Sequence, residues 1–415
     1  MKYRSIKGTK DLLPAETGLW HHVEADVRYM MSVFNYREIR TPVFEATSLF
    51  ARSIGELTDI VTKEMYTFND RGDESLTLRP EGTASVLRAY LQNNLGEQAP
   101  LTKLYYLGPM FRQERPQAGR LRQFYQFGAE AIGSSSPLLD VEMMILPLEV
   151  YRNLGINDTK LALNSVGCEK CRPRYKKLLI AELKKIQKSL SPDSQARLSQ
   201  NPLRVLDSKD ERDRKLTADV PLIKDHLCEE CRPHFEEVQS ALNALNISFH
   251  IDGRMVRGLD YYTKTAFEIT HQSLGSQDAL AGGGRYDLLI QELGGKATPA
   301  VGFAAGMERL MIVLEKNKRE IASPSPKLYL AALDEPSRSW AFRTAVDLRK
   351  KGIAVETDYL DRSLKAQMRD ANRLAAEYVV VIGSEELKSG SGKLKNMRSG
   401  TERPVSLSDL AGALG

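Results

Sequence analysis

The sequence predicts an α+β protein in which a helical segment interrupts one domain and a smaller α/β domain follows. Three observations lead to this prediction. Residues 1–165 mix helical patterns with short β-rich runs, and strand patterns with clustered glycines return at 250–322. Residues 166–249 are rich in lysine and arginine and mostly helical in pattern, which indicates an insertion. Residues 327–415 alternate strand and helix patterns, which predicts a mostly parallel sheet.

Length and composition narrow the class of protein. The chain has 415 residues, which is too long for one ordinary core, so two or three domains are expected. It has no run of 18 apolar residues, and its N-terminus lacks the apolar core of a signal peptide, so we expect no membrane association. Four cysteines do not make a disulfide scaffold, which favours a reduced, cytoplasmic protein. The net charge of +5 is compatible with an anionic partner but does not require one.

A polar hairpin is predicted within the first domain. LTKLYYLGPMF at 101–111 has a strand pattern, and PQAG at 116–119 is a turn signal between two β-patterned runs. We therefore expect an antiparallel hairpin over 103–130. Successive side chains of a strand point to opposite faces. The residues expected to share one face are Arg122, Phe124, Gln126, Gly128 and Glu130.

This face carries a cation, an aromatic ring, an amide, a gap and an anion in order. One interpretation is a surface ladder of salt bridges. The other is a binding floor for a molecule with its own anion, ring and cation. ATP together with an amino acid fits the second interpretation, because arginine would meet phosphates, the aromatic ring would meet adenine, and a carboxylate would meet an ammonium group.

Three further segments are consistent with such a floor. TLRPEGTASVLRAY at 77–90 turns a strand into a helix, and Glu81 and Thr83 near its start could equally serve only as caps. Arg257 precedes a glycine and a strand, where a simple ion pair with Asp260 is the alternative. AGGGRYD at 281–287 supplies glycines where the backbone must approach something closely. The GxxxxGK[ST] and GxGxxG patterns are absent, so ATP would bind in another way.

Together these motifs resemble the histidyl-tRNA synthetase family of class II aminoacyl-tRNA synthetases, in its bacterial form. FRQERPQAGRLRQF resembles class II motif 2, GFAAGMERL at 302–310 resembles motif 3, and TPVFEATSLFARSIGE at 41–56 resembles motif 1. RGLDYYT and AGGGRYD resemble the two histidine-specific motifs. The resemblance covers nearly the whole chain. It implies a class II antiparallel sheet catalytic domain with a helical insertion, and a C-terminal α/β anticodon-binding domain at 327–415.

The resemblance also implies an activity. Members of the family attach L-histidine to tRNA(His) through a histidyl-adenylate, using ATP with Mg²⁺, and they act as homodimers. One alternative is the non-catalytic, histidine-binding regulatory subunit of ATP phosphoribosyltransferase. That paralogue usually lacks the anticodon domain, whereas residues 327–415 resemble one. A second alternative is an RNA-binding or sensing module built on a synthetase relic.

The resemblance assigns roles to the ATP-binding and catalytic positions. Arg112 would hold the α-phosphate, and Phe124 would stack on adenine. Arg309 would cover the other face of adenine and meet the phosphates. Arg257 would supply a cation where other class II enzymes use a metal ion.

Histidine and tRNA positions follow from the same resemblance. The amino group of histidine would be held around Glu81, Gly82, Thr83 and Gln126. Glu130 and Tyr262 would bond the imidazole, and Tyr261 would shape the pocket. At the tip of the hairpin, Arg115 and Gln117 would meet the acceptor end of tRNA. In the C-terminal domain, a basic hairpin is a further candidate for phosphate contact through Lys393, Lys395 and Arg398.

The four cysteines form two repeats of one pattern. Cys168 and Cys171 belong to CEKCRP, and Cys228 and Cys231 belong to CEECRP. Two CxxC pairs are typical of a tetrahedral zinc site, and both pairs lie in the predicted insertion, so they could close on one structural Zn²⁺ ion. The alternatives are four unliganded thiols or a redox-labile pair. The family does not require zinc.

Overall fold

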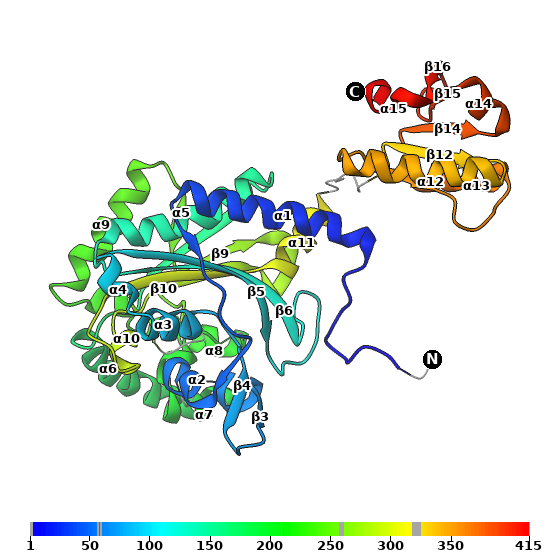
Figure 1. Ribbon diagram of the computed structural model, residues 1–415. Helices are drawn as coiled ribbons and strands as arrows, with labels where there is room; N and C mark the ends of the chain where they lie inside the picture. The colour runs from blue at the N-terminus through cyan, green and yellow to red at the C-terminus, as the bar shows by residue number, and fades with distance from the viewer. Residues whose placement is uncertain are drawn as a thin grey trace. The chain divides into compact units, whose positions relative to one another are not determined.

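The computed structural model describes residues 3–55, 58, 60–208, 210–256, 261–317 and 325–414 (Figure 1). It forms two compact units, Met1–Ile321 and Ala322–Gly415.

The first unit is built on an eight-stranded sheet in the order β1-β5-β6-β11-β10-β9-β7-β8. The six inner strands are antiparallel, and the edge strands β1 and β8 pair in parallel with β5 and β7. This is the antiparallel sheet that the family resemblance implies. In the order of the sheet, the strands are β1 (Arg37–Glu38), β5 (Thr102–Phe111), β6 (Gln123–Ile132), β11 (Ala300–Gly306), β10 (Ala279–Arg285), β9 (Thr263–His271), β7 (Thr159–Ser165) and β8 (Phe249–Ile251).

Strands β5 and β6 form the predicted hairpin. Their pairing runs without a shift from Thr102–Ile132 to Phe111–Gln123. Phe127 and Ala129 of β6 lie in the main hydrophobic core. The alternate residues of β6 face the other side of the sheet, where Phe124 and Ile132 pack in separate, smaller clusters. One strand therefore supplies both the core and the opposite, polar face.

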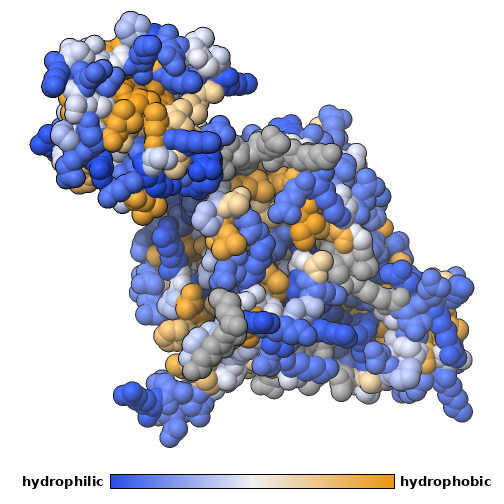
Figure 2. Space-filling model, turned by 90° about the vertical axis from the view of Figure 1, so that its right-hand side faces the viewer, coloured by the Kyte–Doolittle hydropathy of each residue, from blue (hydrophilic) through white to orange (hydrophobic). Residues whose placement is uncertain are grey.

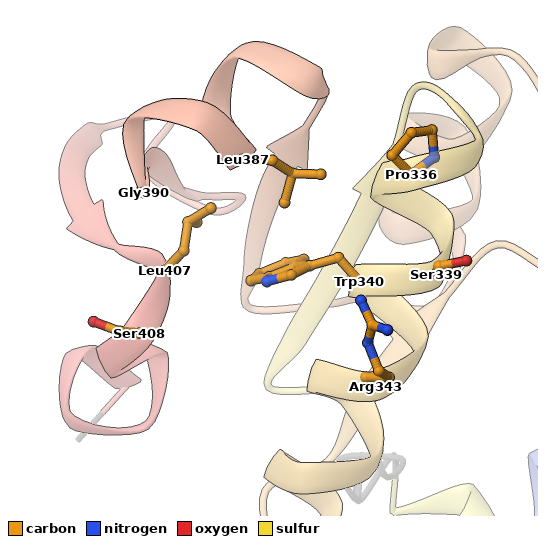
Figure 3. Close-up of a pocket in the computed structure, with 8 residues that line it drawn as sticks. All are labelled: Pro336, Ser339, Trp340, Arg343, Leu387, Gly390, Leu407 and Ser408. Carbon is orange, nitrogen blue, oxygen red and sulfur yellow. The ribbon is translucent and has the colours of Figure 1, made fainter.

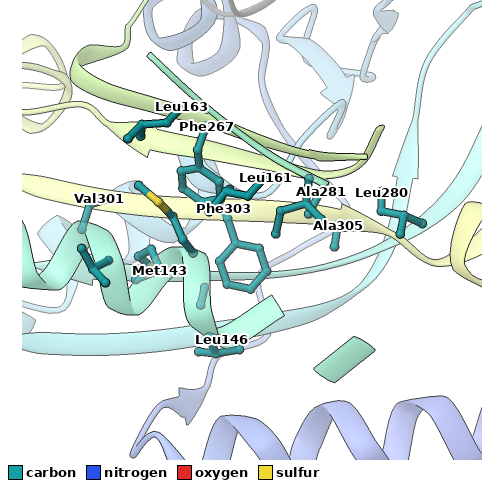
Figure 4. Close-up of a cluster of buried hydrophobic side chains, with 14 of the residues drawn as sticks. Met143, Leu146, Leu161, Leu163, Phe267, Leu280, Ala281, Val301, Phe303 and Ala305 are labelled. Carbon is teal, nitrogen blue, oxygen red and sulfur yellow. The ribbon is translucent and has the colours of Figure 1, made fainter. Parts of the chain in front are cut away.

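Helices cover the core face of the sheet (Figure 1). In the centre of this core, Met143 and Leu146 of α5 lie beside Phe303 of β11 (Figure 4). The polar face is covered mainly by α3 (Thr83–Gln92), whose Leu87 and Tyr90 pack near Ile132. The helices that share the main core are α1 (Pro14–Val33), α5 (Pro137–Asn153), α6 (Cys171–Ile186), α9 (Cys231–Ala244) and α11 (Met307–Lys316).

Two smaller parts complete this unit. One is a three-stranded antiparallel sheet with the order β2-β4-β3. In the chain, β2 precedes α2 (Thr47–Ile54), and β3 and β4 follow it. The segment between β7 and β8 is helical, as its pattern predicts. The remaining strands and helices are β2 (Phe44–Ala46), β3 (Tyr66–Asn69), β4 (Ser75–Leu78), α4 (Leu95–Gln98), α7 (Pro192–Gln200), α8 (Glu211–Leu216) and α10 (Leu289–Glu292).

The second unit has the predicted alternation of strands and helices. Its sheet has the order β13-β12-β14-β15-β16, in which the first three strands are parallel and the last two form an antiparallel hairpin. The elements are β12 (Leu328–Ala332), α12 (Glu335–Lys350), β13 (Val355–Thr357), α13 (Leu364–Arg373), β14 (Tyr378–Ile382), α14 (Ser384–Ser389), β15 (Ser391–Asn396), β16 (Glu402–Ser406) and α15 (Leu410–Leu414).

The helical pattern in the sequence of this unit predicts a helix at 340–352, but α12 begins five residues earlier, at Glu335. The cause is a cap at Asp334, whose Oδ1 accepts a hydrogen bond of 2.9 Å from the backbone N–H of Ser337. Capping by a side chain three residues upstream satisfies N–H groups that would otherwise lack partners, and it sets the true start of the helix.

Within the described ranges, no helix is both long and apolar enough to cross a bilayer. The face of the molecule drawn in Figure 2 is mostly hydrophilic, and its hydrophobic residues gather in separate small patches.

Candidate functional site

Glu81 fixes the start of α3 on the polar face of the sheet. Its Oε2 accepts a hydrogen bond of 2.6 Å from the N–H of Thr83, and its Oε1 accepts one of 2.8 Å from Ala84. The capping alternative is confirmed for Glu81 and wrong for Thr83, because Thr83 is the first helical residue and Glu81 satisfies the free N–H groups. Burial raises the pKa of Glu81.

Glu130 lies at the centre of a buried constellation. Its Oε1 accepts a hydrogen bond of 2.7 Å from Thr83 Oγ1, and its Oε2 accepts one from the hydroxyl of Tyr286. The side chain is fully buried, and this burial raises its pKa to about 8, with the nearby Glu81 adding to the shift. Tyr286, from the AGGGRYD segment, was not singled out from the sequence.

Replacing Glu130 with glutamine should flatten the pH dependence of stability of the ligand-free protein. The folded state raises the pKa of Glu130 from 4.5 to about 8, so it favours the protonated carboxyl. This contribution to stability is fully present below pH 4.5 and is lost as the pH rises through 8. Thermal unfolding between pH 5 and pH 8.5 would measure the effect. The exposed Glu236→Gln is the control, and equal pH slopes for Glu130→Gln and wild type would contradict the prediction.

Glycines allow close packing on the face of the sheet around Glu130, the floor of this constellation. A Cβ at Gly302 would collide with a carboxylate oxygen of Glu130, and a Cβ at Gly82 would collide with the ring of Tyr106. Gly128 faces the same ring from the sheet. The side chains and backbone therefore approach one another more closely than any other residue at these positions would permit.

Polar atoms without a protein partner face this floor. Gln126 Oε1 and the hydroxyl of Tyr106 are buried and have no hydrogen-bond partner among the described residues. Buried polar groups are normally satisfied, so such atoms indicate a place for a ligand or a water molecule. Gln126, Tyr106 and Glu130 lie on the same face, because β6 pairs Gly128 with Tyr106 and alternates in direction.

Tyr261 and Tyr262 form an aromatic wall of the same pocket. Both are buried in a cluster with Tyr286 and Leu87. The ring centroids of Tyr261 and Tyr262 are 4.8 Å apart, and those of Tyr261 and Tyr286 are 5.6 Å apart. The structure therefore brings the two predicted tyrosines to Glu130 through Tyr286.

Arg112, Phe124 and Arg309 lie farther along the polar face. The guanidinium of Arg112 lies 5.3 Å from the ring centroid of Phe124, and its Nε donates a 2.9 Å hydrogen bond to the carbonyl of Pro80. Arg309, the third residue of α11, donates from Nη1 to the carbonyl of Ala279 at 2.6 Å. Burial lowers the pKa of Arg309, and the positive charges of Arg120 and Arg112 add to the shift, while the carboxylates of Glu114 and Glu268 oppose it.

The hairpin tip contacts Arg309, whose Nε donates a hydrogen bond of 3.3 Å to the carbonyl of Gly119. Arg115 and Gln117 are exposed, and Gln117 forms an isolated β-bridge with Arg120 around the predicted turn. Arg257 and its alternative ion-pair partner Asp260 lie outside the described residues.

A buried ionic network behind the floor was not predicted. Asp140 of α5 accepts hydrogen bonds from Arg285 Nε at 2.7 Å, from Thr265 Oγ1 at 2.6 Å and from His234 Nε2 at 2.7 Å. Arg285 also pairs with Asp287 at 2.8 Å. This network ties α5, α9, β9 and β10 together. The arginine of AGGGRYD could have suggested a buried charge, but nothing local indicates its partners.

The four cysteines converge, although they come from two places 60 residues apart. The Sγ atoms of Cys168 and Cys171 are 3.7 Å apart, those of Cys168 and Cys228 are 3.7 Å apart, and those of Cys171 and Cys231 are 3.8 Å apart. All four sulfurs lie within 4.8 Å of one another. Contact with Cys231 lowers the pKa of Cys171 to about 4. Cys171 and Cys231 are the first residues of α6 and α9, where helix dipoles favour thiolates, but the contact with Cys171 raises the pKa of Cys231.

The second unit carries its own hollow. It has a volume of about 580 Å³ and lies between α12, α14 and the segment after β16 (Figure 3). The ring of Trp340 points into it, toward Leu387 and Leu407 (Figure 3). On the neighbouring hairpin, Lys393 and Arg398 are exposed, and Lys395 pairs across the strands with Glu402. Glu402 lies 3.8 Å from Lys393 and 3.9 Å from Lys395, so part of this positive charge is balanced.

An antiparallel sheet with a motif 2-like hairpin, an arginine at the start of α11 and a separate α/β unit defines the class II aminoacyl-tRNA synthetase fold. The family description "Histidyl-tRNA synthetase" matches residues 8–310, and "Anticodon binding domain" matches residues 328–415. The chain belongs to the histidyl-tRNA synthetase family.

Individual relatives agree with this assignment. The histidine–tRNA ligase of Halothermothrix orenii is 48% identical over 411 residues, covering 99% of this chain and 98% of the relative. That of Caldanaerobacter subterraneus subsp. tengcongensis is 47% identical over 415 residues, covering 100% of both. The crystal structure of the apo histidyl-tRNA synthetase of S. aureus is similar with a TM-score of 0.85 and 37% identity, covering 99% of each chain.

Proposed function

We propose that the chain activates L-histidine with ATP and transfers the histidyl group to tRNA(His). The observation that carries this proposal is the buried carboxyl of Glu130, held by Thr83 and Tyr286 on a glycine floor. Beside it lies Gln126 Oε1, which has no hydrogen-bond partner among the residues that the structure describes. This constellation lies within the region that matches the histidyl-tRNA synthetase family.

The pocket suits histidine because it offers hydrogen-bond acceptors at two ends. Glu130, aided by Tyr262, would meet the imidazole nitrogens. Glu81, Thr83 and Gln126, beside Gly82, would surround the amino group. A site that pairs a polar ring in this way rejects analogues that leave its buried groups without partners. Tyr261 closes the aromatic side of the same pocket.

The cations suit adenylate formation. A carboxylate oxygen of histidine attacks the α-phosphorus of ATP, a new O–P bond forms, and the bond to the β-phosphate oxygen breaks to release pyrophosphate. Arg112 and Arg257 would stabilise the negative charge that builds on the α-phosphoryl oxygens. Phe124 and Arg309 would enclose adenine, and Mg²⁺ would enter with ATP as part of the substrate. No protein nucleophile is required, since positioning supplies much of the rate.

Transfer completes the proposed reaction. A ribose hydroxyl at the 3′ end of tRNA attacks the acyl carbon, and AMP leaves. Arg115 and Gln117 at the exposed hairpin tip would contact the acceptor end. The second unit would read the anticodon, with exposed Lys393 and Arg398, beside Lys395, as candidates for phosphate contact. Such a role fits an enzyme of the cytoplasm, where tRNA is charged.

The decisive experiment is ATP–pyrophosphate exchange with each of the common amino acids, followed by charging of tRNA(His). We expect exchange with histidine alone, and esterification of tRNA(His) at a rate that depends on histidine. A folded protein that binds histidine without exchange would favour the regulatory-subunit alternative. A protein that binds tRNA but neither exchanges nor binds histidine would favour the RNA-binding alternative.

We also propose a homodimer that forms through the sheet β2-β4-β3. Phe44 and Phe68 are 49% and 46% exposed, and the strand register places them on one face with Leu76 and Leu78. An apolar sheet face of this kind suits a second copy of the chain, because identical faces can bury one another. This segment includes the motif 1-like residues.

Phe68→Glu should shift the protein from dimer to monomer, because it places a charge in the proposed apolar contact. Sedimentation equilibrium would measure the mass. Phe342→Glu, at a 52% exposed phenylalanine of α12, is the matched control and should leave the mass unchanged. A monomeric wild type would refute the proposed dimer.

We further propose that the four cysteines bind one structural zinc ion. A tetrahedral ion with Zn–S bonds of about 2.3 Å separates neighbouring sulfurs by about 3.8 Å. Three of the sulfur pairs are 3.7, 3.7 and 3.8 Å apart, which fits this geometry.

Protein purified without added metal should contain one zinc per chain by elemental analysis. Chelation should loosen residues 166–249, detected as faster hydrogen exchange there, because the ion joins two chain segments 60 residues apart. Cys228→Ser should lower the zinc content. A reduced wild-type protein with no bound metal would exclude a structural zinc site.

A further inference from the structure

We propose that Arg172 is a positioning residue that links the four-cysteine cluster to the histidine pocket. The proposal rests on the proposed function and on metal binding by the cluster. Arg172 follows Cys171 at the start of α6, and its backbone N–H donates a 2.9 Å hydrogen bond to the carbonyl of Cys168. Its Nη2 donates to the backbone carbonyl of Tyr262, and its Nε donates to the carbonyl of Val166 at 3.3 Å.

The chain just after Tyr262 is held by the same cysteine loop. Val166 N–H donates to the carbonyl of Lys264 at 2.7 Å, and Lys264 N–H donates to the carbonyl of Gly167 at 2.8 Å. Lys264 has φ +50°, a left-handed conformation that a lysine retains only where its surroundings hold it. A Cβ at Gly167 would lie 2.7 Å from the sulfur of Cys171, so this loop packs directly on the cluster.

From Tyr262 the contacts continue into the pocket. Its ring packs against Tyr261, which meets Tyr286 at 5.6 Å, and the hydroxyl of Tyr286 donates to Glu130. A filled cluster would fix the loop at 166–172, and the loop would fix the Tyr262 backbone. An emptied or oxidised cluster would release both, and histidine would then have to order its own pocket at a cost in affinity.

The sequence repeat supplies a matched control. Arg232 occupies the same position after Cys231 in CEECRP, and its backbone N–H likewise donates to the carbonyl of Cys228, at 3.0 Å. Its side chain is exposed, whereas that of Arg172 is half-buried between the loop and Tyr262. Arg172 and Arg232 thus occupy the same position after their cysteine pairs, but they differ in the side-chain contact that Arg172 makes with the carbonyl of Tyr262.

The first experiment compares histidine binding by calorimetry in reduced, zinc-loaded wild type, Arg172→Ala, Arg172→Lys and Arg232→Ala. We expect the affinity of Arg172→Ala for histidine to fall about 10-fold, which is the loss typical of a hydrogen bond made by a charged group. Arg172→Lys should recover part of it, and Arg232→Ala should bind as the wild type does. The KM for histidine should rise in exchange assays, while kcat and the KM for ATP stay nearly unchanged. Wild-type affinity in Arg172→Ala would overturn the proposal.

The second experiment removes the metal with a chelator under reducing conditions. Wild-type affinity for histidine should fall by a similar factor, and Arg172→Ala should lose little more, because the two changes break one connection. An equal further loss in Arg172→Ala would overturn the link, and so would metal removal that leaves wild-type affinity unchanged. Histidine binding that depends on Arg172 in a protein without exchange activity would refute the proposed function and support the link.

Discussion

Replacing Arg112 with alanine should reduce histidine-dependent ATP–pyrophosphate exchange by about 100-fold or more. The guanidinium is already fixed before any ligand arrives, by the carbonyl of Pro80 at 2.9 Å and by the ring of Phe124 at 5.3 Å. A cation held in place needs no reorganisation when charge builds on the α-phosphoryl oxygens, which is why its loss should lower kcat more than it raises the KM for histidine.

The control is Arg152→Ala, which removes an arginine whose side chain is 70% exposed on α5. It should leave exchange unchanged. Arg257→Ala tests the second cation in the same assay and should lose a comparable factor. An Arg112→Ala enzyme that retains wild-type exchange would show that this guanidinium does not meet the reacting phosphate.

Asp140→Ala should destabilise the first unit by about 3–5 kcal/mol. The buried carboxylate accepts hydrogen bonds from Arg285, His234 and Thr265. Its removal leaves a fully buried guanidinium with only part of its counter-charge, from Asp287. A buried charge that loses a partner costs far more than a surface pair contributes, because water cannot replace the partner.

Chemical denaturation, followed by a signal specific to the first unit, would measure this change. Asp158→Ala is the matched control, since Asp158 also bonds a histidine, His271, at 2.7 Å but is 53% exposed. It should cost less than about 1 kcal/mol. Equal costs at the two aspartates would contradict the assignment of Asp140 as a buried charge that holds four elements together.

Local periodicity made much of the fold predictable. The turn at 116–119 and the alternation along β6 identified the hairpin and its polar face, because both depend on neighbouring residues alone. The β-α-β-α-β pattern of the second unit followed in the same way. The helix start at Glu335 did not, because a cap depends on one hydrogen bond from Asp334 and not on a repeating pattern.

The partners of the site residues could not be read from local patterns. Glu130 and Tyr286 lie 156 positions apart, and Arg172 reaches a carbonyl 90 positions away. Asp140 draws its partners from three other elements. Such contacts are set by how strands and helices pack. For Glu81 and Arg257, the sequence also allowed a simpler local explanation, a helix cap and an ion pair. The resemblance to a known family supplied the expected roles of Glu81, Arg112 and Glu130, which residue patterns alone left open.

The glycine floor limits how this pocket could change. At Gly82, Gly128 and Gly302, even one added methyl group would strike a ring, an oxygen or the backbone. Substitutions at these glycines therefore cannot gradually reshape the base of the pocket. A variant that accepts a bulkier or differently shaped amino acid would have to alter the side walls, at Tyr261 or Tyr262, while the base stays as it is. Attempts to engineer new substrate selectivity should begin there.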